Sequence, residues 1–474
     1  MLHDSGVLTD REAEFRLGAG NYDSVGQTAD RNMSIRLGRY TVHESGGERQ
    51  PHVLVVTYLF PPCNAIAVRR PIALVRSYRS LGVRTTVLTS AISGAFPDDA
   101  SRGILRTGDL RTRFETQYQA LVGYAAAAVP VRKKPRWWTR AIVPDVTAIS
   151  WLPAALPRLR SLLREDRPDG VLTTSPPEAS HLLGLVAQRK GVPWMADFRD
   201  GWRFDPSHPR PWFGAIDKSL ERRVATSADA VTAVNEPIAA DLRRRVGAHV
   251  VHVSNGFDSA AVAAATDEHE TLSSRRFSIV YTGTLGLDAP EQHDPHGSGA
   301  RAFVAALQRL AAHGSNLPVG FEVVVAGVVS ESERELLTSG SLREVVRVLG
   351  PLSHERALGL QRAADGLLLL AGTGEATTAK VFEYLSAEKP IFALARADGP
   401  AARLLVRAGD HLITSPTDET QIEQDLVHFI ETWAENGTYR PNPSFVLEEY
   451  DFDRLAERML DLFVEIGAFS RSDQ

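Results

Sequence analysis

The chain has 474 residues, of which 43% are hydrophobic and 23% charged, and its formal net charge is −5 at pH 7. This length exceeds one ordinary hydrophobic core, so we expect two domains. The slight negative charge gives no general reason to expect nucleic acid binding. The single cysteine, Cys63, excludes an internal disulfide framework. With no apolar run of about 20 residues and an acidic stretch where a signal peptide would be basic, we expect a cytoplasmic protein.

Residues 1–50 are polar and charged, and we expect them to form a disordered N-terminal tail. The first domain is predicted to span residues 51–262. It opens with an apolar strand at 52–56, a stiff turn containing Pro61 and Pro62, a helix over 65–81 and a second strand at 83–89. This βαβ unit lacks the G-x-G-x-x-G sequence, so a nicotinamide cofactor is not expected.

Residues 131–140 combine five cations with Trp137 and Trp138. Basic and aromatic residues in this arrangement suit an anionic membrane surface or a lipid-phosphate acceptor. The alternative is a solvated helix end whose tryptophans cap the core. The sequence therefore leaves peripheral membrane contact open.

The rest of the first domain contains apolar strands near 168–175, 192–198 and 249–253. Ligands of doubly wound sheets bind beyond the carboxyl ends of the strands. Five polar residues fall at such ends and are expected to line one cleft: Thr174, Ser175, Asp197, Arg199 and Asp200. In the alternative interpretation, Asp197, Arg199 and Asp200 form a structural ion-pair network. His181 follows early in a helix, where it either faces the cleft or packs in the core.

Residues 263–276 read as a linker, and a second domain is predicted over 277–446. Its strands are expected near 277–282, 321–327, 346–352, 366–370 and 390–394. Residues 447–474 contain an amphipathic helix.

The strand at 366–370 leads into a Gly/Thr turn and then a helix, so unpaired N–H groups at the helix start face an anion. The charged and hydroxyl side chains there are Glu375, Thr377, Thr378, Lys380 and Glu383.

Several of these segments resemble retaining glycosyltransferases of family 4. Glu375 and Glu383 have seven residues between them, as in the E-x7-E element of that family. Asn-Gly-Phe-Asp at 255–258 resembles the NG-x-D hinge motif of the family. Three further segments are similar to those of a bacterial subgroup: Thr-Thr-Ser-Pro-Pro at 173–177, Ala-Asp-Phe-Arg-Asp at 196–200 and Lys-Val-Phe-Glu-Tyr at 380–384. The resemblance implies an α/β GT-B fold, in which two doubly wound Rossmann-like domains face each other across a cleft. The final helix of that fold packs back on the N-terminal domain.

The resemblance also implies an activity. It is the transfer of a sugar from a UDP-, GDP- or dTDP-sugar to a glycan, lipid-linked or small-molecule acceptor, with retention of configuration. Glu375 would hold the sugar, and Glu383 the ribose. The other residues that the resemblance implies for the donor are Gly283, Thr284, Arg301, Leu349, Gly350, Leu352, Thr377, Thr378 and Lys380. The resemblance also implies residues that take part in catalysis, bind the acceptor or form the phosphate loop. They are Pro62, Asn64, Arg69, Ser175, His181, Asp197, Arg199 and Asp200.

The chain departs from the family where most members carry an Arg and a Lys, because residues 283–293 contain neither. Lys380 and Arg301 are then the expected phosphate cations. No D-x-D sequence stands at a strand end, so neither a metal ion nor another cofactor is expected. Two alternatives stay open: a nucleotide-sugar epimerase of the same fold, and a degenerate, non-catalytic nucleotide-sugar-binding protein.

Overall fold

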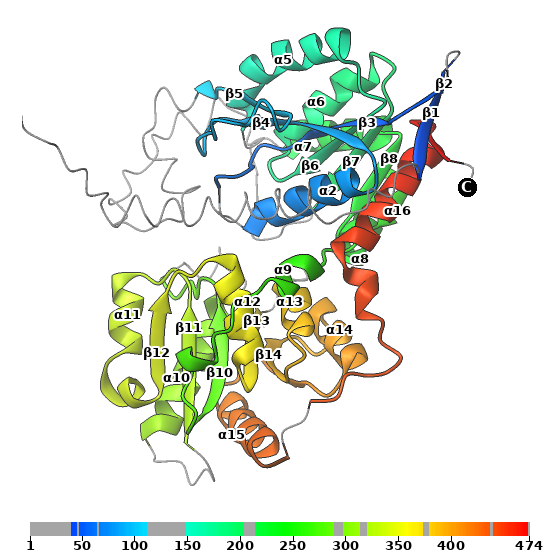
Figure 1. The fold of residues 1–474 in the computed structure, drawn as a ribbon. Helices are drawn as coiled ribbons and strands as arrows, with labels where there is room; N and C mark the ends of the chain where they lie inside the picture. The colour runs from blue at the N-terminus through cyan, green and yellow to red at the C-terminus, as the bar shows by residue number, and fades with distance from the viewer. Residues whose placement is uncertain are drawn as a thin grey trace, which may run out of the picture.

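The computed structural model describes residues 39–44, 47–63, 66–110, 148–202, 214–288, 297–312, 320–372, 379–436 and 439–472. They form two α/β domains, one above the other in Figure 1, each built on its own parallel sheet. This is the expected class of fold.

The N-terminal domain has a seven-stranded sheet of order β5-β4-β3-β6-β7-β8-β9, with all neighbouring strands parallel. The strands are β3 (His52–Val56), β4 (Arg84–Ser90), β5 (Ile104–Thr107), β6 (Gly170–Ser175), β7 (Trp194–Phe198), β8 (Ala230–Ala233) and β9 (Val250–His252). All five residues of β3 are buried, because helices cover both faces of the sheet.

Alternate residues of the strands belong to different cores, because successive side chains point to opposite faces. Leu54 and Val56 pack on one face with α5 (Leu152–Glu165), α6 (Ala179–Gln188) and α8 (Glu236–Val246). Val53 and Val55 pack on the other face with α2 (Arg69–Ser80) and α16 (Phe452–Glu465). The short η1 (Ile66–Val68) precedes α2, η3 (Ile149–Trp151) precedes α5, and α7 (Gly214–Ser227) lies between β7 and β8.

The C-terminal domain has a six-stranded parallel sheet of order β12-β11-β10-β13-β14-β15. Its strands are β10 (Phe277–Thr282), β11 (Phe321–Ala326), β12 (Val346–Gly350), β13 (Gly366–Gly372), β14 (Ile391–Ala395) and β15 (Leu412–Thr414). One face packs against α10 (Gly297–Ala312), α15 (Glu419–Asn436), α11 (Glu331–Leu337) and η5 (Gly340–Glu344). The other face packs against α12 (His354–Ala363), α13 (Lys380–Ser386) and α14 (Pro400–Ala408).

The backbone passes between the domains twice, and the two passages lie side by side. Phe257 donates to the carbonyl of Tyr450 at 3.1 Å, and Phe452 donates to the carbonyl of Phe257 at 3.0 Å. A Cβ at Gly256 would lie 2.0 Å from the Tyr450 oxygen, so only glycine fits there. η6 (Leu447–Tyr450) then leads into α16, which packs on α2 of the N-terminal domain.

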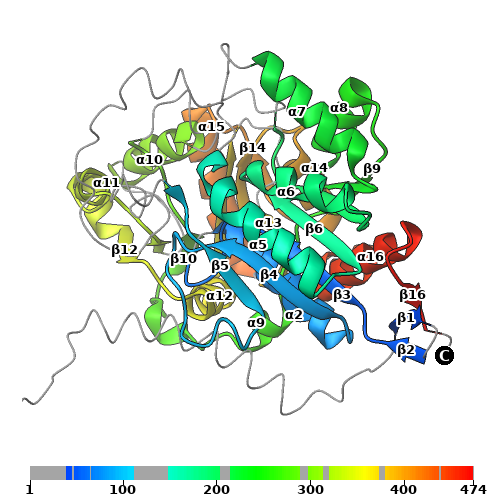
Figure 2. The same ribbon diagram turned by 90° about the horizontal axis from the view of Figure 1, so that it is seen from above.

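Residues 39–44 and 47–50 correct the expectation of a disordered tail up to residue 50. β1 (Tyr40–Glu44) pairs antiparallel with β2 (Gly47–Arg49) and with β16 (Ser470–Arg471), beside α16 in Figure 2. Tyr40 is buried against Phe469, with ring centroids 5.8 Å apart. This apolar contact and the strand pairing supply the order that the polar local sequence does not predict.

The segment 263–276, predicted to be a linker, and the residues just before it contain ordered structure. α9 (Ser259–Ala263) and η4 (His269–Thr271) lie between the domains and pack on α12. Glu268 accepts from Arg356 Nε at 2.7 Å, and a Cβ at Gly359 would lie 1.9 Å from the Thr266 oxygen. These contacts join the segment to the C-terminal domain.

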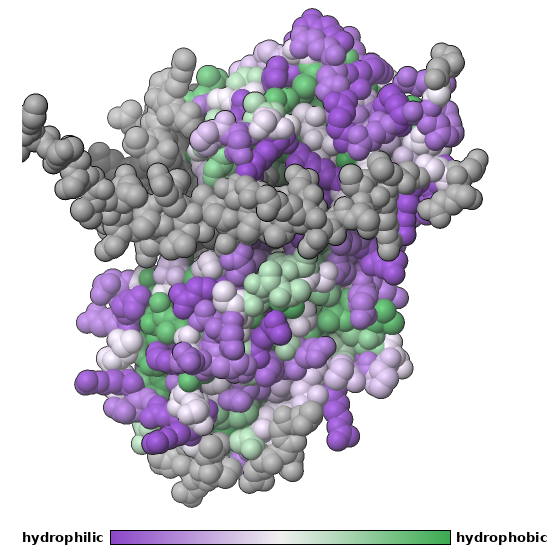
Figure 3. All heavy atoms as spheres, in the orientation of Figure 1, coloured by the Kyte–Doolittle hydropathy of each residue, from purple (hydrophilic) through white to green (hydrophobic). Residues whose placement is uncertain are grey.

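The surface is largely hydrophilic on the face drawn in Figure 3. The large apolar side chains exposed among the described residues are far apart in the sequence: Leu110, Ile216, Leu336, Val406 and Val446. No described helix is both long enough and apolar enough to cross a bilayer.

Candidate functional site

Helix α13 carries two charged side chains, and its apolar and aromatic residues are buried in the core. Lys380 and Glu383 are three positions apart and so lie on the same face of the helix. The residues between and beside them, Val381, Phe382, Tyr384 and Leu385, are buried. Figure 1 shows α12 and α13 at the end of the C-terminal domain that faces the N-terminal domain. The motif at 380–384 therefore combines core anchors with two partly buried charged groups.

The aromatic residues of this motif fix the position of α13. The Phe382 ring lies 5.0 Å from the Tyr450 ring, centroid to centroid, and so links α13 to the interdomain passage. The Tyr384 hydroxyl accepts from the backbone N–H of Thr282 at 3.0 Å. Burial raises the pKa of Tyr384 to about 12, so its hydroxyl stays protonated.

The ammonium of Lys380 is held against the loop that follows β10. Its Nζ donates to the Tyr281 hydroxyl at 3.2 Å and lies 4.6 Å from the centroid of that ring. The Tyr281 hydroxyl in turn donates to the carbonyl of Thr284 at 2.7 Å. A Cβ at Gly283 would lie only 2.3 Å from Nζ. The structure thus brings together Lys380, Gly283 and Thr284, and adds Tyr281, which the sequence analysis did not select.

The carboxylate of Glu383 is paired with His354, the first residue of α12. His354 Nε2 lies 3.0 Å from Glu383 Oε1, and the two side chains are 20% and 16% exposed. Burial alone would raise the pKa of Glu383. The hydrogen bond with His354 and the charges of His354, Arg69 and Lys380 outweigh it and hold that pKa below its usual value. Glu383 is therefore an anion at neutral pH.

Arg69 brings a cation from the opposite domain. It is the first residue of α2, and its side chain is partly buried. Burial lowers the pKa of the guanidinium, while the charges of Glu383, Asp258 and Glu355 oppose that shift. Glu383 and Glu355 belong to the C-terminal domain, so Arg69 lies within electrostatic reach of both carboxylates across the interface.

The remaining predicted donor residues within the described chain belong to the end of β12, the residues just after it, and α10. Gly350 ends β12 with a φ of 80°, and its carbonyl accepts from Gly327 N–H at 2.8 Å. Leu349 and Leu352 beside it are partly buried against the core. Arg301 donates to the carbonyl of Leu287 through Nε at 3.0 Å and Nη2 at 2.7 Å. Arg301 therefore supports the loop after β10.

Asp197 corrects the expectation that this carboxylate lines the cleft. It is completely buried, and Arg70, Thr174 and Thr232 all donate to it. The alternative interpretation, a structural ion pair, describes Asp197. Its partner is Arg70, whereas the alternative interpretation placed Asp197 in a network with Arg199 and Asp200. The guanidinium of Arg199 instead donates to backbone carbonyls, those of Ser175 at 2.8 Å, Pro176 at 3.0 Å and Ala67.

Asp200 differs from these two residues, because it is exposed at the carboxyl end of β7. Ser175 is 2% exposed, and Pro62 is half-buried. His181 is fully buried; its Nδ1 lies 2.8 Å from Thr173 Oγ1, and its ring lies 4.6 Å from that of Phe198. His181 therefore packs in the core and does not face the cleft.

Some of the predicted residues lie outside the part of the chain that the structure describes. They are Asn64, Glu375, Thr377, Thr378 and the basic segment 131–140. Among the described residues, no group of three or more His, Cys, Asp or Glu side chains is arranged to hold a metal ion.

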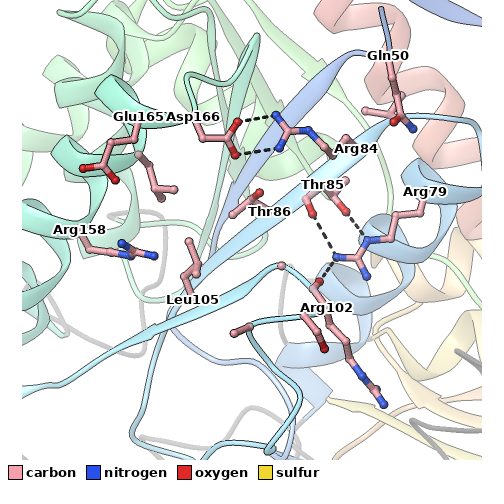
Figure 4. A pocket seen from close by; sticks show the side chains of 15 residues that line it. Gln50, Arg79, Arg84, Thr85, Thr86, Arg102, Leu105, Arg158, Glu165 and Asp166 are labelled. Atoms are coloured by element: carbon pink, nitrogen blue, oxygen red, sulfur yellow. Dashed lines mark hydrogen bonds and ion pairs between the residues drawn. The ribbon is translucent and has the colours of Figure 1, made fainter.

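A separate cavity of about 590 Å³ lies at the amino ends of β4 and β5 (Figure 4). Arg84 lines it and forms two hydrogen bonds with Asp166, of 2.8 and 2.7 Å. Arg79, also in the lining, donates to Thr85 Oγ1 at 2.6 Å. Ligands of open α/β sheets bind at the carboxyl ends of the strands, so we do not place the functional site here.

His354 and Tyr281 are the site residues that the sequence analysis did not identify. His354 begins α12, just after the loop that follows β12, and Tyr281 lies near the carboxyl end of β10. The rule used for Asp197, that polar groups beyond strand ends meet in one place, could have selected both.

Comparison with known proteins gives one domain assignment and a fold. Residues 67–256 match the family model described as the glycosyl transferase 4-like domain. A search of curated proteins finds no match. The matched region contains α2 with Arg69 and the strand ends that carry Ser175 and Asp200.

Solved structures show the same fold at low sequence identity. A glycosyltransferase from Rickettsia africae ESF-5 is 13% identical with a TM-score of 0.55, over 88% of this chain and 99% of that chain. The N-terminal domain of Candida albicans trehalose-6-phosphate phosphatase is 13% identical with a TM-score of 0.53, over 90% and 100%. UDP-GlcNAc 2-epimerase from Methanocaldococcus jannaschii is 9% identical with a TM-score of 0.51, over 88% and 100%. The architecture is GT-B, as expected.

Proposed function

We propose that this protein is a retaining glycosyltransferase that moves a sugar from a nucleotide-sugar donor to an acceptor. The observation that carries the proposal is the face of α13. Lys380 and Glu383 stand there side by side, three residues apart, and Arg69 of the other domain lies within electrostatic reach of Glu383. A cation beside an anion suits a ligand that carries both phosphate and ribose hydroxyls.

Lys380 has the role that the chemistry needs most. When the bond between the sugar and the phosphate breaks, negative charge develops on the β-phosphate, and a fixed cation there lowers the barrier. Tyr281 and the Gly283 loop hold the ammonium in place before any ligand arrives. Thr377 and Thr378 would add hydroxyl donors, and Glu375 would hold the sugar.

The N-terminal domain is proposed to bind the acceptor. Asp200 is an exposed carboxylate at a strand end, so it can accept a hydrogen bond from an acceptor hydroxyl. In the family that this chain resembles, the departing phosphate is thought to take the acceptor proton, so no separate general base is assigned. Arg69 and Lys380 supply positive charge from both domains, and no metal ion or resident cofactor is part of the proposal.

The test is a binding measurement followed by an activity measurement. UDP-, GDP-, ADP- and dTDP-sugars are screened by thermal shift with the wild type, Glu383→Ala and Glu335→Ala. Glu335 is an exposed glutamate on α11 and serves as the matched control. We expect one donor to raise the melting temperature of the wild type and of the control, but not that of Glu383→Ala. Equal shifts in all three proteins, or no shift with any donor, would contradict the proposal.

The pair of His354 and Glu383 also favours a second candidate, epimerisation of a nucleotide sugar. A His and a carboxylate 3.0 Å apart are the kind of set that proton transfer at a sugar carbon requires. The two activities differ in one respect: an epimerase converts its donor without an acceptor. Binding without sugar release from any donor, across a broad panel of acceptors, would instead identify a non-catalytic nucleotide-sugar-binding protein.

A further inference from the structure

We propose that His354 is a positioning residue that holds Glu383 ready for the ribose hydroxyls of the nucleotide. On this account His354 makes the site selective for nucleotides with intact sugar hydroxyls. The inference rests on the proposed function, because it assumes that Glu383 faces the ribose.

The hydrogen bond between the two residues leaves half of the carboxylate available. His354 Nε2 lies 3.0 Å from Oε1, and among the described residues Oε2 of Glu383 has no hydrogen-bond partner. The exposed fractions, 20% for His354 and 16% for Glu383, show that the pair reaches the surface. One oxygen is therefore fixed by the protein, and the other can accept from a ligand hydroxyl.

The backbone around His354 is itself fixed. Ser353 is the N-cap of α12, and its hydroxyl accepts from the N–H of Arg356 at 3.3 Å. His354 is the next residue, so the first turn of α12 fixes the position of its backbone. A glutamate side chain has three rotatable bonds, and holding it in one arrangement before the ligand binds lowers the entropy cost of binding.

Without His354, Glu383 would have two other partners. Lys380 precedes it by three residues on the same helix face, a spacing at which glutamate and lysine form ion pairs. Arg69 lies within electrostatic reach from the other domain. In the structure the Lys380 ammonium instead contacts the Tyr281 hydroxyl at 3.2 Å. By holding Glu383, His354 keeps this carboxylate from turning toward the lysine ammonium.

The experiment measures selectivity for the sugar hydroxyls. Dissociation constants are determined by calorimetry for UDP, GDP, ADP and dTDP and for the 2′,3′-dideoxy form of each. The proteins are the wild type, His354→Ala, His354→Gln and the control His428→Ala, which changes an exposed histidine on α15. Glutamine keeps an N–H donor at a similar reach, and alanine removes it.

We expect the wild type to bind one nucleotide about tenfold or more tightly than its dideoxy form. His354→Ala should reduce this ratio to roughly twofold or less. His354→Gln and His428→Ala should largely keep it. If His354→Ala has a lowered melting temperature, His354→Met, which fills the volume without a donor, takes its place under the same criterion.

The outcomes separate the two proposals. A wild type that binds none of the nucleotides overturns the proposed function. A wild type that selects against the dideoxy form, together with a His354→Ala variant that selects equally well, overturns the role of His354 and leaves the proposed function standing. Loss of selectivity in His354→Gln as well as in His354→Ala would show that the N–H donor is not what matters, and it also contradicts this inference.

Discussion

Arg70 and Asp197 form an ion pair in which both side chains are almost fully buried, 3% and 0% exposed. Arg70 Nε donates to Oδ2 at 3.1 Å, and Nη2 donates to Oδ1 at 3.0 Å. Thr174 and Thr232 donate to the same carboxylate at 3.0 and 2.8 Å. Burial would raise the pKa of Asp197, but the arginine and the Thr232 hydroxyl outweigh it and lower that pKa. The pair joins α2 to the ends of β6, β7 and β8.

The first prediction separates structural from functional carboxylates at this edge of the sheet. Asp197→Asn leaves Arg70 buried without its counter-ion, so we expect the free energy of unfolding to fall by about 3–5 kcal/mol. Asp200→Asn changes an exposed group and should alter it by no more than about 0.5 kcal/mol. Urea unfolding followed by circular dichroism measures both. Comparable stability of the two variants would contradict the structural role of Asp197.

The second prediction concerns the phosphate cation. Lys380→Ala removes the ammonium next to the Gly283 loop, and we expect nucleoside diphosphate binding to weaken by about 1.5–3 kcal/mol, or roughly tenfold to a hundredfold. Calorimetric titration is the measurement. Lys218→Ala, at an exposed lysine on α7, is the control and should bind as the wild type does. Unchanged affinity in Lys380→Ala would remove Lys380 from the site.

The third prediction uses the close approach at Gly283. Its φ is +127°, which L side chains rarely adopt, and an added Cβ would lie 2.3 Å from Lys380 Nζ. Gly283→Ala should therefore displace the ammonium and weaken nucleotide binding about as much as Lys380→Ala does. Gly320→Ala is the matched control, because the nearest atom to its Cβ would be 3.6 Å away. If Gly283→Ala binds like that control, the ammonium does not act from this position.

The fourth prediction is a pH dependence of stability that arises from His181. Burial lowers the pKa of His181 to about 3, whereas in the unfolded chain it titrates near 6.5. Below about pH 6.5 the unfolded state therefore binds the proton and the folded state does not. The free energy of unfolding falls as the pH decreases from 6.5 toward 3.

At pH 5 the contribution of His181 to this loss is roughly 2 kcal/mol, at about 1.4 kcal/mol per pH unit. Urea unfolding at pH 7.5 and pH 5.0 checks it. In His181→Gln the decrease between the two values should be smaller by that amount, and His428→Ala should reproduce the wild-type decrease. His52 and His411, whose pKa values burial lowers to about 4, act in the same direction and account for part of the remaining loss.

Much of the fold could be predicted, because buried parallel strands are continuous apolar runs. β3 and β13 are buried along their whole lengths, and the helix after β13 places Lys380 and Glu383 on one face as the spacing requires. The short β1 could not be predicted. Its order depends on pairing with β16, near the other end of the described chain, and no local pattern records that contact.

The candidate site was predicted less completely, because burial of polar groups depends on partners distant in the sequence. Asp197 and Asp200 both follow an apolar run, and only the position of Arg70 in α2 decides that the first is buried. His354 similarly belongs to the candidate site because it is hydrogen-bonded to Glu383, which lies on a different helix. The spacing within one segment therefore identifies which residues share a helix face but not which carboxylate faces a ligand.

The paired passages at Phe257 and Asp451 have a mechanical consequence for opening. Two hydrogen-bonded chains side by side resist twisting more than a single connection does, so the easiest relative rotation is bending about the line that they define. If the domains open by this bending, Arg69 would move away from Glu383, and closing would return the two residues to the same relative position. Gly256 lies against the Tyr450 carbonyl, and the Tyr450 ring packs on Phe382, so a side chain added at Gly256 would be felt at α13 through these two aromatic residues.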